Sequence, residues 1–95
     1  MNFPVSLLLV ELLLPEIHSL KGKRSIIRRI QHRLRTKFNV SVAEVANQDQ
    51  WQSAVIAVCV VSSSNKVAQQ TLQSVEKYVD EFHDVQVMQT RIEEL

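Results

Sequence analysis

Two long apolar segments dominate the hydrophobic pattern of this chain, and each has the length of a β-strand. Residues 5–14 contain one charged side chain, Glu11, and lie between Pro4 and Pro15. Their leucines would also suit a helix, but proline is typical of the ends of elements, which favours a strand. Residues 53–61 are apolar and rich in β-branched side chains, which also favour a strand.

Two other segments repeat their apolar residues at the helical period. Ser19 is a suitable N-cap for a helix over residues 20–37. A second helix is predicted to start after the capping residues 62–65 and to end near residue 82. The two predicted core-facing stripes are Leu20, Ile27, Ile30, Leu34 and Phe38 in the first helix, and Ala68, Leu72, Val75, Val79 and Phe82 in the second.

Residues 38–46 and 85–92 alternate in a way that predicts two further strands. The first of these forms a hairpin with strand 53–61 through the polar turn 47–50. The last strand is predicted to place Val85, Val87 and Gln89 on one face. The order strand, helix, strand, strand, helix, strand predicts one α+β domain over residues 1–95, a ferredoxin-like sandwich. Its four-stranded antiparallel sheet carries both helices on one face, with the first and third strands in the centre.

The central strands are apolar on both faces, although helices are predicted to cover only one of them. An uncovered apolar face favours self-association, and a homo-oligomeric interaction or regulatory module is one functional hypothesis. The alternative is that a tail or a twisted edge covers the face. Trp51 fits a partner's pocket or, as we favour, a packing role at the end of the core. The candidate interface residues are Val5, Leu7, Leu9, Leu13 and Trp51.

Charge is distributed very unevenly along the chain. Eight of the eleven basic residues, and no acidic residue, lie between Ile17 and Ala43, although the formal net charge is only +1. Arginine, whose planar fork suits phosphate, outnumbers lysine among them. The predicted sheet lacks central aromatic residues on which bases could stack, so any RNA would bind the first helix. The candidate nucleic-acid-binding residues are Lys21, Lys23, Arg24, Arg28, Arg29, Arg33 and Arg35, with Lys37 at the margin.

Two other interpretations of this basic helix remain open. Acidic residues on and after the second helix, including Glu76, Asp80, Glu81 and Asp84, could neutralise it within the same molecule. An acidic protein could also be its partner. We predict contact with structured RNA or the ribosome as the leading function, because like charges four residues apart repel each other and phosphates would relieve that repulsion.

Little in the sequence indicates catalysis. The three histidines are scattered, and the only cysteine, Cys59, sits in an apolar run where burial is expected. One glycine cannot build a phosphate-binding loop. We therefore predict no enzyme activity, metal or cofactor, although a site completed by dimerisation, or a phosphatase-like activity suggested by fold analogy, would escape this reasoning. With no segment typical of a signal peptide or a membrane span, a cytoplasmic location is expected.

Several short motifs in this order resemble one family. They are Ser-Leu-Lys-Gly-Lys-Arg-Ser at residues 19–25, Phe-Asn-Val-Ser-Val-Ala-Glu at residues 38–44, Trp51 in the hairpin, and Val-Val-Ser at residues 60–62. The chain resembles the YlxP-like family of small bacterial proteins of unknown function over nearly its whole length. That resemblance implies a ferredoxin-like fold and a bacterial cytosolic setting. It implies no catalytic residue.

Overall fold

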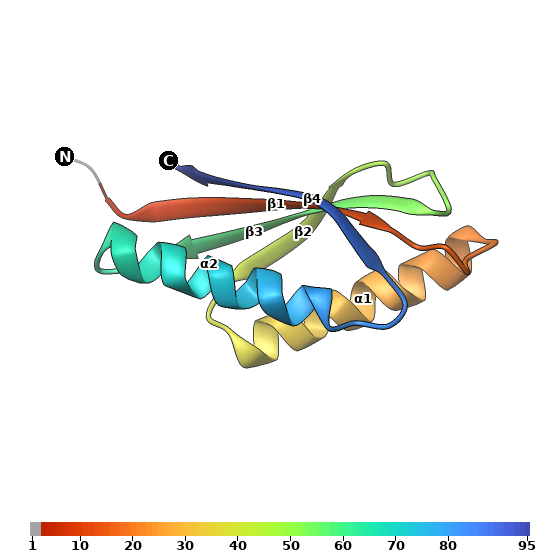
Figure 1. The fold of residues 1–95 in the computed structure, drawn as a ribbon, viewed down its shortest axis with the longest axis horizontal. Helices are drawn as coiled ribbons and strands as arrows, with labels where there is room; N and C mark the ends of the chain where they lie inside the picture. Colours follow the sequence, from red (N-terminus) through yellow and green to blue (C-terminus); the bar gives the residue numbers. More distant parts are fainter. Residues whose placement is uncertain (1–2) are drawn as a thin grey trace.

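A computed structural model describes residues 3–95 as a sheet with two helices packed on one face (Figure 1). The sheet order is β2-β3-β1-β4, with all neighbours antiparallel. This confirms the predicted α+β ferredoxin-like fold, with the first and third strands in the centre. In chain order the elements are β1 (Val5–Leu13), α1 (Leu20–Lys37), β2 (Ser41–Ala46), β3 (Ser53–Val61), α2 (Asn65–Asp80) and β4 (Gln86–Glu94).

Serine side chains fix the starts of both helices. The Ser19 hydroxyl accepts a hydrogen bond from the Gly22 amide at 3.0 Å, and the Ser64 hydroxyl accepts one from the Val67 amide at 3.1 Å. Each hydroxyl satisfies a backbone donor that the first helical turn leaves without a partner. The predicted limits of α1 (20–37) and β3 (53–61) are confirmed, whereas α2 ends at Asp80, two residues before the predicted end.

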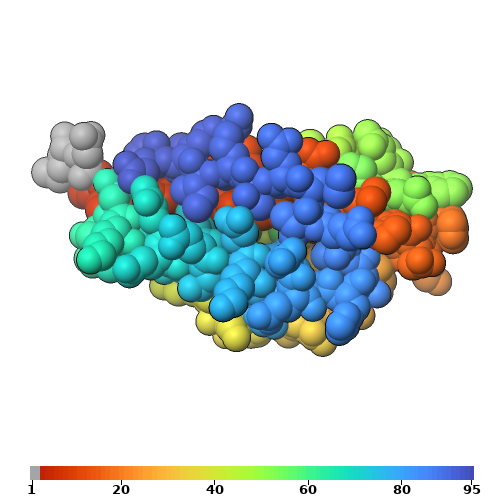
Figure 2. Space-filling model, in the orientation of Figure 1, coloured from red at the N-terminus to blue at the C-terminus, as the bar shows by residue number. Residues whose placement is uncertain are grey.

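The core lies between the sheet and the helices. Alternate residues of β1 and β3 point into it, and the inner side of each helix covers them. The buried apolar side chains that the strands supply are Leu8, Val10, Leu12, Val42, Ala54, Ile56, Val58 and Val60. The helices supply Ile26, Ile27, Ile30 and Leu34 from α1 and Ala68, Leu72, Val75 and Val79 from α2. The molecule is elongated, 46 Å by 21 Å by 19 Å, with α2 and β4 along one long side (Figure 2).

Two β-bulges change which side chains share a face. A register shift beside Leu12 leaves Val87 paired with Leu12 and Thr90 paired with Val10, so these two residues share the core face. The prediction that Val87 lies with Gln89 is wrong, because an extra residue in one strand reverses the alternation beyond it. The second bulge follows Glu44 in β2.

The face of the sheet opposite the helices carries no helix (Figure 1). We call it the open face; its residues on the two central strands are Val5, Leu7, Leu9, Glu11 and Leu13 of β1, and Val55, Ala57, Cys59 and Val61 of β3. Cys59 lies here and is only partly buried. Its expected burial is therefore only partial, since a central strand alternates between the covered and the uncovered face.

Trp51 precedes β3 in the hairpin, and 51% of its surface is exposed. This exposure contradicts the favoured packing role at the end of the core. Trp51 lies between β2 and β3 in the sequence, so it is outside the strands that form the open face.

Candidate nucleic-acid interface

The basic residues of α1 divide into three groups because a helix turns by about 100° per residue. Lys23 lies on the inner side of the helix. Arg29, Arg33 and Lys37 follow one another at intervals of four residues on the side nearest α2, and we call them the α2-side row. Lys21, Arg24, Arg28 and Arg35 lie on the other flank, toward β2, and form the β2-side row. Each group has a different set of neighbours.

Lys23 is fully buried, so we remove it from the candidate surface. Its Nζ lies 2.9 Å from Glu44 Oε2 in an ion pair and donates hydrogen bonds to the carbonyl oxygens of Asn47 at 2.5 Å and Gln48 at 3.4 Å. Asn47 has a positive φ of 62°, a turn conformation that asparagine tolerates. The ammonium group therefore fastens the start of α1 to the β2–β3 hairpin.

The α2-side row is held within the molecule. Arg29 forms an ion pair and hydrogen bond with Asp84, which follows α2. The Arg33 guanidinium lies 5.5 Å from the centre of the Phe82 ring, and the Lys37 ammonium lies 4.6 Å from that of Tyr78. Both distances are within the range of a cation–π interaction. These three cations help join α1 to α2.

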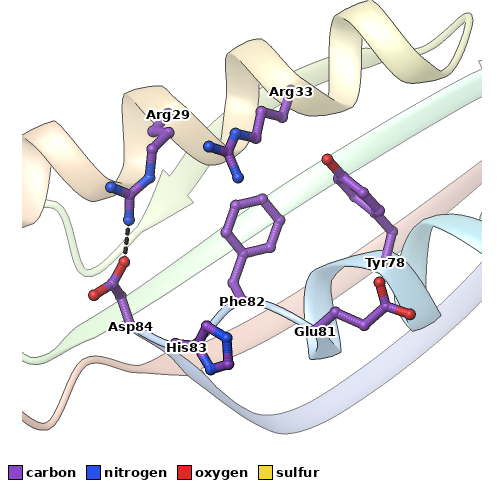
Figure 3. A pocket seen from close by; sticks show the side chains of 7 residues that line it. All are labelled: Arg29, Arg33, Tyr78, Glu81, Phe82, His83 and Asp84. Carbon is purple, nitrogen blue, oxygen red and sulfur yellow. Dashed lines mark hydrogen bonds and ion pairs between the residues drawn. The ribbon is translucent and has the colours of Figure 1, made fainter.

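A hollow of about 410 Å³ lies beside this row (Figure 3). Arg29 and Arg33 form its α1 wall, with the Arg33 side chain directed toward the ring of Phe82. The opposite wall carries two carboxylates, Glu81 and Asp84, together with His83 and the ring of Tyr78. Because both signs of charge face the hollow, it offers a phosphate little net attraction.

The Arg29–Asp84 pair should contribute little to stability, since both side chains are about half exposed, at 44% and 46%. Water screens such a pair and the two side chains lose freedom in forming it. We expect Asp84→Asn to lower the free energy of unfolding by less than about 0.5 kcal/mol. Urea denaturation measures this change. A loss of more than about 1.5 kcal/mol, beyond the usual range for exposed pairs, would show that the pair does more than we infer.

The β2-side row is open to solvent. All four of its residues are exposed, and no carboxylate of residues 3–95 forms an ion pair with them. Arg35 donates one hydrogen bond to the Val42 carbonyl at 2.9 Å, which leaves most of its five donors available. The row extends over fifteen residues of helix, about 21 Å from the first to the last. His32, also exposed, lies on the same flank.

The structure thus separates residues that the sequence presents as one cluster. Lys21, Arg24, Arg28 and Arg35 share one exposed flank, whereas Arg29 and Arg33 face α2. Sequence analysis did not identify Phe82 and Tyr78 as partners of the cations, since Phe82 was assigned to the apolar stripe of the second helix and Tyr78 was given no role. Asp84, in contrast, was among the acids expected to neutralise arginine, and it is the one acid of α2 and its following turn that forms an ion pair with α1 in the described chain.

Comparison with known proteins gives a family. The model of the family described as "Protein of unknown function (DUF503)" matches residues 5–92. The chain belongs to this family. It is also similar to a protein of Bacillus subtilis (strain 168) named "Uncharacterized protein YlxP", with 37% identity over 83 residues that cover 87% of this chain and 90% of the relative. The resemblance inferred from the motifs is thereby confirmed, and neither name assigns an activity.

Residues 3–95 contain neither a membrane-spanning helix nor a cluster of metal-ligating side chains. Their helices include none with the length and apolarity needed to cross a bilayer. The same residues bring no three His, Cys, Asp or Glu side chains together in a group that could hold a metal ion.

Proposed function

We propose that this protein binds structured RNA, ribosomal RNA included, through the β2-side row of α1. The observation that carries the proposal is the set of four exposed bases, Lys21, Arg24, Arg28 and Arg35, without a carboxylate partner among residues 3–95. Arginine contributes three of the four, and its guanidinium can bind phosphate oxygens with two parallel hydrogen bonds.

The row also opposes the stability of its own helix. The first turn of α1 contains no acid and includes Lys21, although the positive end of the helix dipole disfavours a cation there. Arg24 and Arg28 are four residues apart and repel each other. Each effect costs only a few tenths of a kcal/mol to about 1 kcal/mol, but an anionic ligand would remove both. This supports a role in binding rather than in folding.

The setting of the helix favours duplex RNA over DNA. Ile26, Ile27, Ile30 and Leu34 are buried against the rest of the fold, and the α2-side row is occupied. A helix held on two sides offers one flank of basic residues, which suits phosphate contacts rather than the reading of base edges in the DNA major groove. It can lie across the shallow minor groove of A-form RNA and contact the phosphates on either side. The central strands lack aromatic residues, so stacking of single-stranded bases on the sheet is not expected.

Binding should depend steeply on salt. If the four residues each neutralise one phosphate, log affinity should fall with log salt concentration with a slope of about −3 to −4. Fluorescence anisotropy with a labelled RNA duplex, between about 50 and 200 mM salt, measures the slope. Duplex DNA of the same sequence and an acidic polypeptide serve as comparisons.

Failure to bind RNA at the lowest salt, or affinity indifferent to salt, would overturn the proposal. Tighter binding to the acidic polypeptide than to RNA would also overturn it, because that result would identify a protein as the partner.

A further inference from the structure

The open face has the anatomy of a protein interface. Its centre is apolar, and the charged residues on the same face, Glu11 of β1 with Arg91 and Glu93 of β4, lie at or beside one edge. On the opposite edge, β2 contributes Ser41, Ala43 and Val45, none of them charged. An apolar centre with a polar rim is typical of a surface that a partner covers.

The open face is large enough to form an interface with the open face of a second copy of this chain. Three of the strands have nine residues and β2 has six, which makes them about 30 Å and about 20 Å long, and adjacent strands lie about 4.8 Å apart. The projected area is therefore about 530 Å². The uneven side-chain surface has a larger accessible area than this projection, which brings it toward the ~800 Å² that each partner buries in a standard interface.

The strand register makes this face complementary to itself. Across the sheet, Ala43, Ala57, Leu9 and Arg91 form one row, and Ser41, Cys59, Leu7 and Glu93 form the next. A two-fold axis that lies between two facing sheets, at right angles to the strands and above Leu8, places each row over the other row of the partner. Small residues then meet small ones, and Leu7 meets the partner's Leu9. Arg91 and Glu93 form an ion pair within each copy at 2.9 Å, and the axis places the Arg91 of one pair over the partner's Glu93.

We propose that two copies of this chain associate through their open faces about this axis. The contact is isologous, so it closes as a dimer with no free copy of the surface. Facing sheets about 10 Å apart interdigitate their side chains, and sheet twist rotates the strands by about 30°. That rotation moves the ends of each strand away from the strand that faces it in the partner, but it preserves the contacts near the axis. Both α1 helices lie on the outside of the pair, pointing away from each other.

The arrangement has a consequence for RNA that rests on the proposed function. Two β2-side rows on opposite sides of the dimer cannot bind one short duplex together, so each dimer should bind two duplexes. The association of the protein with itself is measured without RNA, and failure of one proposal is thereby distinguishable from failure of the other.

Analytical ultracentrifugation of the whole chain tests the association. We expect a species of about twice the 10.9 kDa chain mass at micromolar concentration. Leu9→Glu should raise the dissociation constant at least about a hundredfold by placing a carboxylate in the dry centre. Val67→Glu is the matched control, because Val67 is an exposed apolar residue on α2, away from the open face. Circular dichroism verifies that each variant is folded.

A charge exchange tests the position of the axis. Arg91→Glu alone or Glu93→Arg alone should weaken the dimer roughly tenfold, because like charges then face each other. The double variant Arg91→Glu/Glu93→Arg should restore it, since opposite charges meet again. Because Arg91 and Glu93 also pair within one chain, mixing the two single variants isolates the contact between chains: the heterodimer should form more tightly than either single-variant homodimer. Equal weakening in the double variant and in the single variants would overturn the proposed axis.

Cys59 offers an independent readout, since it is the only cysteine of the chain and lies partly exposed on the open face. Its alkylation by a maleimide should slow as protein concentration rises through the dissociation constant. A monomer at about 100 µM, well above typical dissociation constants of stable interfaces, would overturn the proposal. So would a dimer that Leu9→Glu leaves intact or an alkylation rate independent of concentration.

Discussion

Replacing Lys23 with alanine is expected to lower the free energy of unfolding by about 3–5 kcal/mol, the range for breaking a buried ion pair from one side. The substitution removes the donor to two carbonyl oxygens and the only cation that pairs with Glu44 among the described residues. The Glu44 side chain is 17% exposed, but its Oε2 atom is buried and has the Lys23 ammonium as its partner in residues 3–95, so that oxygen would be left without compensation. Loss of the buried alkyl stem would leave a cavity as well.

Chemical denaturation measures this change, and a double-mutant cycle shows how much of it comes from the interaction between Lys23 and Glu44. Lys21→Ala is the control on the same helix, where an exposed lysine should change the free energy of unfolding by less than about 0.5 kcal/mol. Lys23→Met with Glu44→Met removes both charges and keeps apolar volume. This double variant should recover much of the loss, because uncharged replacements of a buried pair are often tolerated. A cost below about 1 kcal/mol for Lys23→Ala would mean that the ammonium group does not hold the hairpin.

Lys23 also marks a limit of sequence analysis. In a run of eight bases its residue type indicated solvent, whereas its helical position placed it on the apolar stripe. The two signals conflict, and only the location of the Glu44 side chain and of the carbonyls of Asn47 and Gln48 resolves the conflict. Those groups are more than twenty residues away in the sequence. No local pattern contains that information.

The fold itself was predictable because the local and periodic signals agree. Serine caps, apolar runs of strand length and helical stripes point to the same six elements, and consistent signals of this kind specify one structure. The bulges in β2 and β4 were not predictable from alternation, since the pattern contains no mark for an inserted residue. The division of the arginines into two rows follows from helix geometry. The capture of Arg29 by Asp84 and of Arg33 by Phe82 depends on the packing of α1 against α2.

The proposed RNA surface makes its sharpest prediction for Arg24 and Arg28. The double reversal Arg24→Glu/Arg28→Glu is expected to weaken binding to duplex RNA about a hundredfold at about 0.1 M salt, which corresponds to about 2.7 kcal/mol. It removes two phosphate contacts and sets two carboxylates against the phosphates that remain. The slope of log affinity against log salt should become shallower by about 1.4 to 1.8, since each lost contact releases correspondingly fewer counterions.

The matched control is Lys66→Glu/Lys77→Glu on α2, which changes the net charge equally but lies on the other helix. It should alter affinity by less than about threefold, because exposed charges farther away than about 10 Å are largely screened at this ionic strength. Anisotropy titration gives the affinities, and denaturation should show both variants within about 1 kcal/mol of the parent, as for exposed positions. If both variants lost RNA affinity equally, the change in net charge alone would explain the loss and the proposed surface would be wrong. Because α1 holds its other cations against α2 and the hairpin, a specific loss at Arg24 and Arg28 would place the RNA on the one basic flank that the fold leaves open.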